Sequence, residues 1–221
     1  MIRGSCRPTK EVVVATPIKD WTEAGPQLDV LARAIEKDLV PILSFPEGAP
    51  HTVAREWACY VDHLGALFSG KVSHTQERFR IYLREVLSKV DAGYCHQADI
   101  LLHMFRHGTV HEFDPKVLMN AAGQRVGWAV YTTRGRNQSI TLEDGRSFPV
   151  SHLTITRHIN LSGQFALCVS TWCLVEDLLR SIDVFKTGMG NPAERTDSWN
   201  KVASELVKPT PFAFMVPQTA H

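Results

Sequence analysis

Apolar residues recur every three or four positions over much of the chain, which is the spacing of amphipathic helices that bury one face. Four such segments precede residue 106, and Pro41 is expected to end the first, because a helix interior does not tolerate its missing N–H. A fifth segment has the broadest apolar face and is expected to lie at the centre of the helices. The predicted helices cover residues 27–39, 52–68, 73–90, 94–105 and 164–186.

The pattern changes between Val126 and His158, where β-branched and aromatic residues are frequent and alternate in places with polar ones. Asp144-Gly145 predicts a hairpin turn, because a tight hairpin needs positive φ at its centre. Pro149 indicates an edge strand, since proline cannot donate to a ladder of hydrogen bonds. This region is therefore predicted to be a small antiparallel β insert.

The predicted fold class is mainly α: a helical bundle of about five helices with a small antiparallel β insert. The bundle spans residues 27–187, and the insert occupies 126–158. Residues 1–26 are read as an N-terminal extension. Residues 188–221 are read as a C-terminal extension that wraps the core or moves, with one short helix near Trp199. A chain of 221 residues fits one such domain with its extensions.

Composition and charge narrow the classes of function. The net charge of +1 gives no strong overall field, so any contact with nucleic acid has to be local. The five cysteines are spread without a CxxC pair, which favours a reduced, cytoplasmic protein. Every long apolar segment is interrupted by charges, so no membrane partner is expected. The phosphate-binding glycine motifs are missing from the sequence, so no cofactor is expected.

The stretch LLHMFRHGTVHEFDPK, residues 101–116, concentrates the chemistry of the chain. In a regular helix His103, His107 and His111 are four positions apart and share a face, which is the spacing of two imidazoles that reach one metal ion. The segment lacks the glutamate of the HExxH motif, however, and Arg106 would repel a divalent cation. Metal binding therefore remains the weaker alternative, and no metal ligand is assigned.

Arg106, a polar residue and His111 follow the pattern Arg-polar-x3-His, here within FRHGTVH at the end of an amphipathic helix. This pattern resembles the signature of the HEPN superfamily, whose members are small all-α bundles. The resemblance implies a metal-independent endoribonuclease or an RNA- or nucleotide-binding protein, and it implies a homodimer. The β insert is not part of a minimal bundle of that family.

The resemblance implies a role for each motif residue. His111 would move the proton of an RNA 2′-hydroxyl or of the leaving oxygen, because an imidazole titrates near neutral pH. Arg106 would stabilise charge on the phosphoryl oxygens, and His107 would orient the substrate. Arg106 and His111 are about 140° apart on a regular helix, so the site needs either a break at Gly108 or two motifs facing each other across a dimer.

Two further basic residues, Arg134 and Arg136 beside the predicted hairpin, are candidates for binding the substrate's phosphates. Two other interpretations stay open. Arg106, His107 and His111 near a helix C-terminus are also favoured by the helix dipole alone. The chain would then be a non-enzymatic interaction or structural protein that uses its histidine face for assembly.

Overall fold

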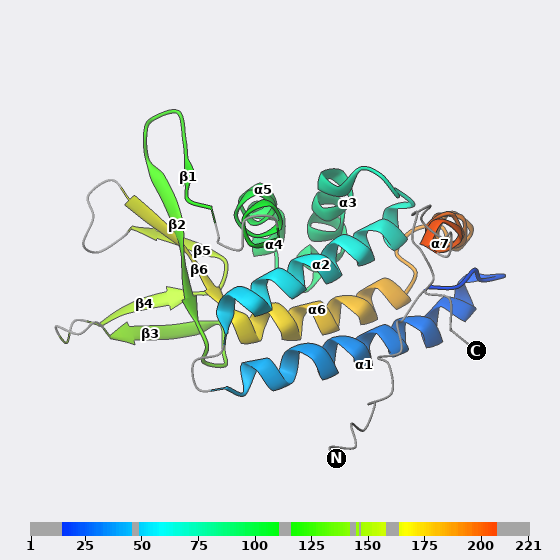
Figure 1. Cartoon of the computed structure of the whole chain (residues 1–221), viewed down its shortest axis with the longest axis horizontal. Coiled ribbons are helices and arrows are strands. Elements are labelled where there is room, and N and C mark those ends of the chain that lie inside the picture. The colour runs from blue at the N-terminus through cyan, green and yellow to red at the C-terminus, as the bar shows by residue number, and fades with distance from the viewer. Residues whose placement is uncertain are drawn as a thin grey trace, which may run out of the picture.

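A computed structural model describes residues 15–45, 49–110, 116–141, 145, 147–157 and 164–206. The fold is α+β, with long helices packed against each other and strands gathered at one end (Figure 1). The helical elements are η1 (Trp21–Glu23), α1 (Ala24–Leu43), α2 (Pro50–Ser69), α3 (Thr75–Ile81), η2 (Tyr82–Val86), η3 (Leu87–Lys89), α4 (Gly93–His96), α5 (Ala98–Leu101), η4 (Leu102–Thr109), α6 (Thr171–Lys186) and α7 (Pro192–Leu206). The strands are β1 (Leu118–Met119), β2 (Arg125–Tyr131), β3 (Asn137–Thr141), β4 (Ser147–Ser151), β5 (Thr154–Arg157) and β6 (Gln164–Ser170).

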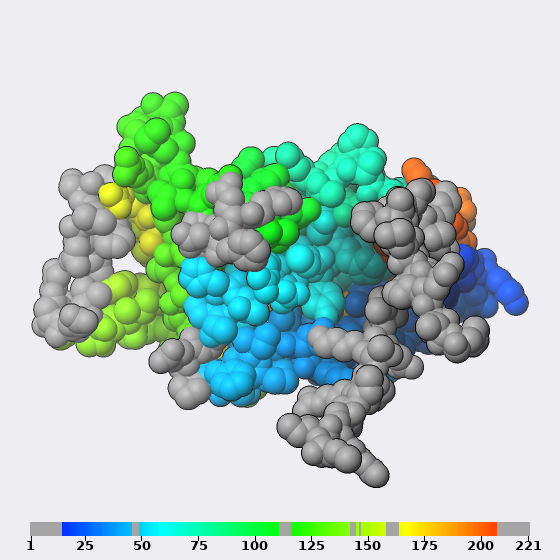
Figure 2. Space-filling model, in the orientation of Figure 1, coloured from blue at the N-terminus to red at the C-terminus, as the bar shows by residue number. Residues whose placement is uncertain are grey.

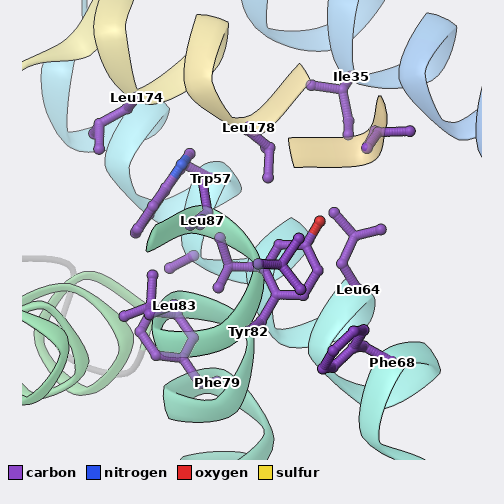
Figure 3. Packing of buried hydrophobic residues seen from close by; sticks show 14 of the residues in the cluster. Ile35, Trp57, Leu64, Phe68, Phe79, Tyr82, Leu83, Leu87, Leu174 and Leu178 are labelled. Atoms are coloured by element: carbon purple, nitrogen blue, oxygen red, sulfur yellow. The ribbon is translucent and has the colours of Figure 1, made fainter. Parts of the chain in front are cut away.

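The helices meet in one apolar core. α1, α2 and α6 run side by side, and α3 and the α4–α5 segment lie over α2 (Figure 1). Figure 3 shows Trp57 and Leu64 from α2 close to Tyr82 from η2 and Leu174 and Leu178 from α6, and all five are fully or almost fully buried. The periodic apolar faces predicted from the sequence are therefore the faces that make this core.

The strands form two sheets. The larger sheet has the order β1-β2-β6-β5, with β2 and β6 parallel, so that Trp128 lies opposite Leu167. The smaller sheet is the antiparallel β3–β4 hairpin, in which Ile140 lies opposite Phe148. Its Val150 packs against the larger sheet, and the hairpin extends away from the helices (Figure 1).

The prediction of a mainly α bundle with a small antiparallel insert is wrong. Residues 164–186, predicted as one helix, are strand β6 followed by helix α6, and β6 joins β2 in a parallel pair. The apolar run from Phe165 to Val169 suits a buried strand as well as a buried helix, so periodicity alone does not distinguish them. Ser170 marks the change, because its hydroxyl accepts from the Cys173 N–H as the N-cap of α6.

The other predicted helices exist with altered ends or winding. Pro41 lies inside the last turn of α1, which runs on to Leu43. The third predicted helix is α3 continued by the π-helical η2 and the 3-10 turn η3, and the fourth is α4, α5 and the π-helical η4. In the C-terminal extension α7 packs on the body, where the Trp199 indole N–H donates to the Thr16 carbonyl at 2.9 Å.

Among the described residues, no helix is both long and apolar enough to span a membrane.

Candidate functional site

Arg106 and His107 belong to η4, where the helix is wound as a π-helix from Leu102 to Thr109. Hydrogen bonds in this winding close from residue i to i+5, which widens the turn. Leu102 and Phe105 are fully buried and fix the segment on the core, and the Thr109 hydroxyl donates to the Phe105 carbonyl at 2.7 Å. The expected break at Gly108 is therefore replaced by a change of winding, since the helix continues through that residue.

Arg106 reaches from η4 to Asp62 on α2, with 3.6 Å between Nη2 and Oδ2, and only 12% of its side chain is exposed. Asp62 makes closer contacts with Arg78 of α3, whose Nε and Nη2 each donate a hydrogen bond to one carboxylate oxygen at 2.8 Å. Arg78 Nη1 also donates to the Val72 carbonyl. One buried carboxylate thus holds two guanidinium groups from two other helices.

The histidines of the motif differ in position. The rings of His103 and His107 stack with 5.4 Å between centroids and 27° between planes, so the expected stripe exists for this pair. His111 lies outside the described residues, and so does its geometry relative to Arg106. Within the described ranges no three His, Cys, Asp or Glu side chains are grouped so as to hold a metal ion.

His63 follows Asp62 on α2 and experiences the same charges. Burial lowers the pKa of His63, and the positive charge of Arg78 lowers it further, against the opposing effect of Asp62. This imidazole is therefore neutral at physiological pH and adds no positive charge to the pair of Arg78 and Asp62.

Arg136, one of the two residues predicted to bind phosphate, is held by carboxylates. Its Nη2 donates to Oδ1 of Asp177 on α6 at 2.5 Å, and its Nη1 donates to Asp91. The Tyr94 hydroxyl donates to the other oxygen of Asp177 at 3.0 Å, and His152 Nε2 lies 3.7 Å from the same oxygen. The guanidinium therefore ties the base of the β3–β4 hairpin to the helices.

Arg136, Asp91, Asp177 and Tyr94 form a second cluster, and His152 contacts it from the end of the other strand of the hairpin. Its backbone N–H donates to the Arg136 carbonyl at 2.7 Å, and its Nδ1 accepts from the Ser170 N–H at 3.0 Å. Burial lowers the pKa of His152 to about 3, with a further contribution from the charge of Arg136. Burial also raises the pKa of Asp177, which Arg136 opposes.

Arg134, the other residue predicted to bind phosphate, is 69% exposed. Its guanidinium lies over the Trp172 ring at 4.1 Å from the centroid, and its Nε is 3.9 Å from Glu176. Arg134 is thus the more accessible of the two predicted phosphate ligands.

The partners in both clusters were not singled out from the sequence. Asp62 and Asp177 are acidic residues within otherwise apolar faces of α2 and α6, and that interruption is the signal that points to buried ion pairs. Tyr94 is a second signal for the cluster around Asp177, because a buried phenol usually finds a hydrogen-bond partner.

Comparisons of the chain with protein-family models, with curated proteins and with solved structures found no match.

Proposed function

We propose that the chain is a HEPN-like protein that acts on RNA as a metal-independent endoribonuclease, through Arg106, His107 and His111. The alternative is a non-enzymatic interaction protein in which Arg106 is structural, and the buried Arg106–Asp62 contact supports it.

The observation that supports the enzyme is the π-helical winding of η4. In a π-helix the hydrogen bonds close from i to i+5. Two residues five positions apart therefore lie nearer to the same face of the helix than they do in an α-helix. Arg106 and His111 are five positions apart. Single π turns inside α-helices also occur frequently at functional sites.

The chemistry assigned to these residues is cleavage without a metal. His111 acts as general base or acid on the RNA 2′-hydroxyl and the leaving 5′-oxygen. Arg106 neutralises the charge that grows on the phosphoryl oxygens, and Asp62 fixes its guanidinium beside Arg78. His107, supported by the stacked His103 ring, orients the substrate.

The test is cleavage of single-stranded RNA in the presence of a chelator. Replacing a general acid or base costs about 10²- to 10⁴-fold in rate, so His111→Ala is expected to lose at least about 100-fold while it stays folded. His96→Ala, which removes an exposed histidine upstream on α4, is the matched control and should keep full activity. Equal rates in His111→Ala and His96→Ala would rule out the nuclease.

We also propose that the active form is a homodimer in the cytoplasm. Mixing two inactive variants, Arg106→Ala and His111→Ala, tests whether two chains share one site. If each site combines Arg106 of one chain with His111 of the other, mixed dimers regain activity in one of their two sites. Activity that stays absent from a verified mixture would contradict a shared site.

A further inference from the structure

Two helical runs meet beside the motif. α3 with η2 and η3 runs from Thr75 to Lys89, and α5 with η4 runs from Ala98 to Thr109. Arg78 meets Arg106 at Asp62, while Arg84 meets Asp99, so the two runs point in opposite directions. Along the line where they meet lie Arg80, Arg84, Asp99 and His103, which we name the seam.

Asp99 is the one carboxylate that the seam contributes. Arg80 Nε donates to its Oδ1 at 2.5 Å, and Arg84 Nη2 donates to its Oδ2 at 2.8 Å. The hydrogen bond from Arg80 lowers the pKa of Asp99, and the charges of Arg80, Arg84 and His103 act in the same direction. A single negative charge is therefore shared by two guanidinium groups that are 29% and 45% exposed.

The seam is continuous with the motif. His103 lies one turn after Asp99, and its ring stacks on His107. At the same end Arg80 lines a polar hollow of about 400 Å³ together with Ser73, His74, Thr75, Gln76 and Glu77. A polymer that enters the motif therefore meets the partly exposed Arg80 and the exposed Arg84 along the neighbouring helical run.

We propose that the seam binds the phosphate backbone of single-stranded RNA and guides the strand to the motif. This inference rests on the proposed function. Arginine forks bind phosphate through paired hydrogen bonds and do so independently of sequence. The exposed His103 ring offers an unpaired base a surface for stacking, which favours a single strand over a duplex.

Binding is measured with a 2′-deoxy single strand of about 12 nucleotides, within the site sizes of known single-strand binders. This strand lacks the 2′-hydroxyl, so its affinity is independent of cleavage. Each phosphate contact on a single strand contributes about 0.7 to the slope of log affinity against log salt. Arg80→Ala/Arg84→Ala is therefore expected to reduce the slope by about 1.4 and to weaken binding roughly 10-fold at low salt.

The matched control is Arg33→Ala/Lys37→Ala. These residues are likewise two cations four positions apart, both exposed, but they lie on α1, across α2 from α3 (Figure 1). The same helix lies along the lower side of the space-filling view, away from the surface of α3 (Figure 2). This variant should keep the wild-type slope, although it loses the same net charge.

Asp99→Asn supplies a result of opposite sign that a purely structural role does not predict. Removing the carboxylate releases both arginines for phosphate, so affinity should rise severalfold and the salt slope should steepen. This variant also keeps the question decidable if Arg80→Ala/Arg84→Ala fails to fold.

Three results would overturn the seam: no binding of the strand by the wild-type protein, equal slopes in the seam and α1 variants, or weaker binding by Asp99→Asn. None of these depends on the cleavage rate of His111→Ala. If the seam binds the strand but His111→Ala cleaves like wild type, the phosphate-binding proposal stands and the nuclease proposal fails.

Discussion

Two clusters of arginine and aspartate in this molecule have opposite charge arrangements. Near the motif, Asp62 lies between Arg78 and Arg106. At the base of the β3–β4 hairpin, Arg136 lies between Asp91 and Asp177. Both join elements that are distant in sequence, but among the described residues the first cluster shares one carboxylate and the second shares one guanidinium.

The difference separates two uses of the same ion pair. Asp177 is only 1% exposed and relies on Arg136 for its counter-charge, so the second cluster is expected to act mainly on stability. Asp62 has two counter-charges, so Arg78 still holds the carboxylate when the charge of Arg106 is removed. The hairpin cluster is thus expected to anchor the fold, and the motif cluster to present a cation.

Arg136→Met gives the largest expected effect because it leaves Asp177 buried beside Asp91 with no guanidinium. Breaking a buried ion pair from one side costs roughly 3–5 kcal/mol. We expect about 3 kcal/mol, the low end of that range, because the carboxyl of Asp177 can take up a proton in response. Chemical denaturation at pH 7.5 measures the free energy of unfolding.

Arg134→Met is the control for this loss, since it removes an exposed arginine two positions away. A surface substitution of this kind changes stability by less than about 0.5 kcal/mol. If the two variants were equally stable, the hairpin would not be anchored by Arg136.

Arg78→Met and Arg106→Met sharpen the comparison within the motif cluster. Hydrogen bonds to a charged group contribute about 1.5–3 kcal/mol, so loss of the paired bonds from Arg78 should cost about 2 kcal/mol. Arg106 lies 3.6 Å from the carboxylate, beyond hydrogen-bond length, and its loss should cost less than about 1 kcal/mol.

The same two variants should rank in the opposite order for RNA cleavage. Arg106→Met is expected to abolish activity in a folded protein, whereas Arg78→Met should keep part of it. An Arg106→Met protein that is less stable than Arg78→Met would assign Arg106 a structural role and favour the non-enzymatic alternative.

The sequence predicts local features of this molecule better than it predicts partners. The apolar periodicity of α1 and α2 is visible because each helix buries one face along its whole length. The strand β6 was missed because both of its faces are covered, which leaves a continuous apolar run without alternation. The sequence does not reveal the clusters, because Asp62 meets Arg78, and Arg136 meets Asp91 and Asp177, only when the elements pack.

The motif itself shows the same limit. Spacing makes Arg106 and His107 candidates, but the 140° between Arg106 and His111 assumes an α-helical period. The structure winds Leu102–Thr109 as a π-helix, so an α-helical period does not describe this stretch. His111 lies beyond the described part of the helix, so its convergence with Arg106 remains a prediction.

An effect smaller than the loss of Arg136 or Arg78 is expected for a pH dependence confined to the hairpin cluster. The imidazole of His152 has a folded-state pKa of about 3, below its ordinary value of 6.5, because it is buried and faces Arg136. Its Nδ1 also accepts from the Ser170 N–H, and protonation would break that bond. The unfolded state therefore binds more protons below pH 6.5, and stability falls as the pH drops through that value.

The free energy of unfolding is expected to be about 1.4 kcal/mol lower at pH 5.5 than at pH 8 because of this one residue. The reason is that pH 5.5 lies about one unit below the unfolded-state pKa of His152. His152→Asn keeps an acceptor for the Ser170 N–H and removes the titration, so its stability should change less with pH by that amount. Subtracting the two profiles cancels the contribution of the Asp177 carboxyl, whose pKa is raised by burial. A matching pH dependence in both proteins would mean that His152 becomes charged without leaving the cluster, and the hairpin would then depend on Arg136 alone.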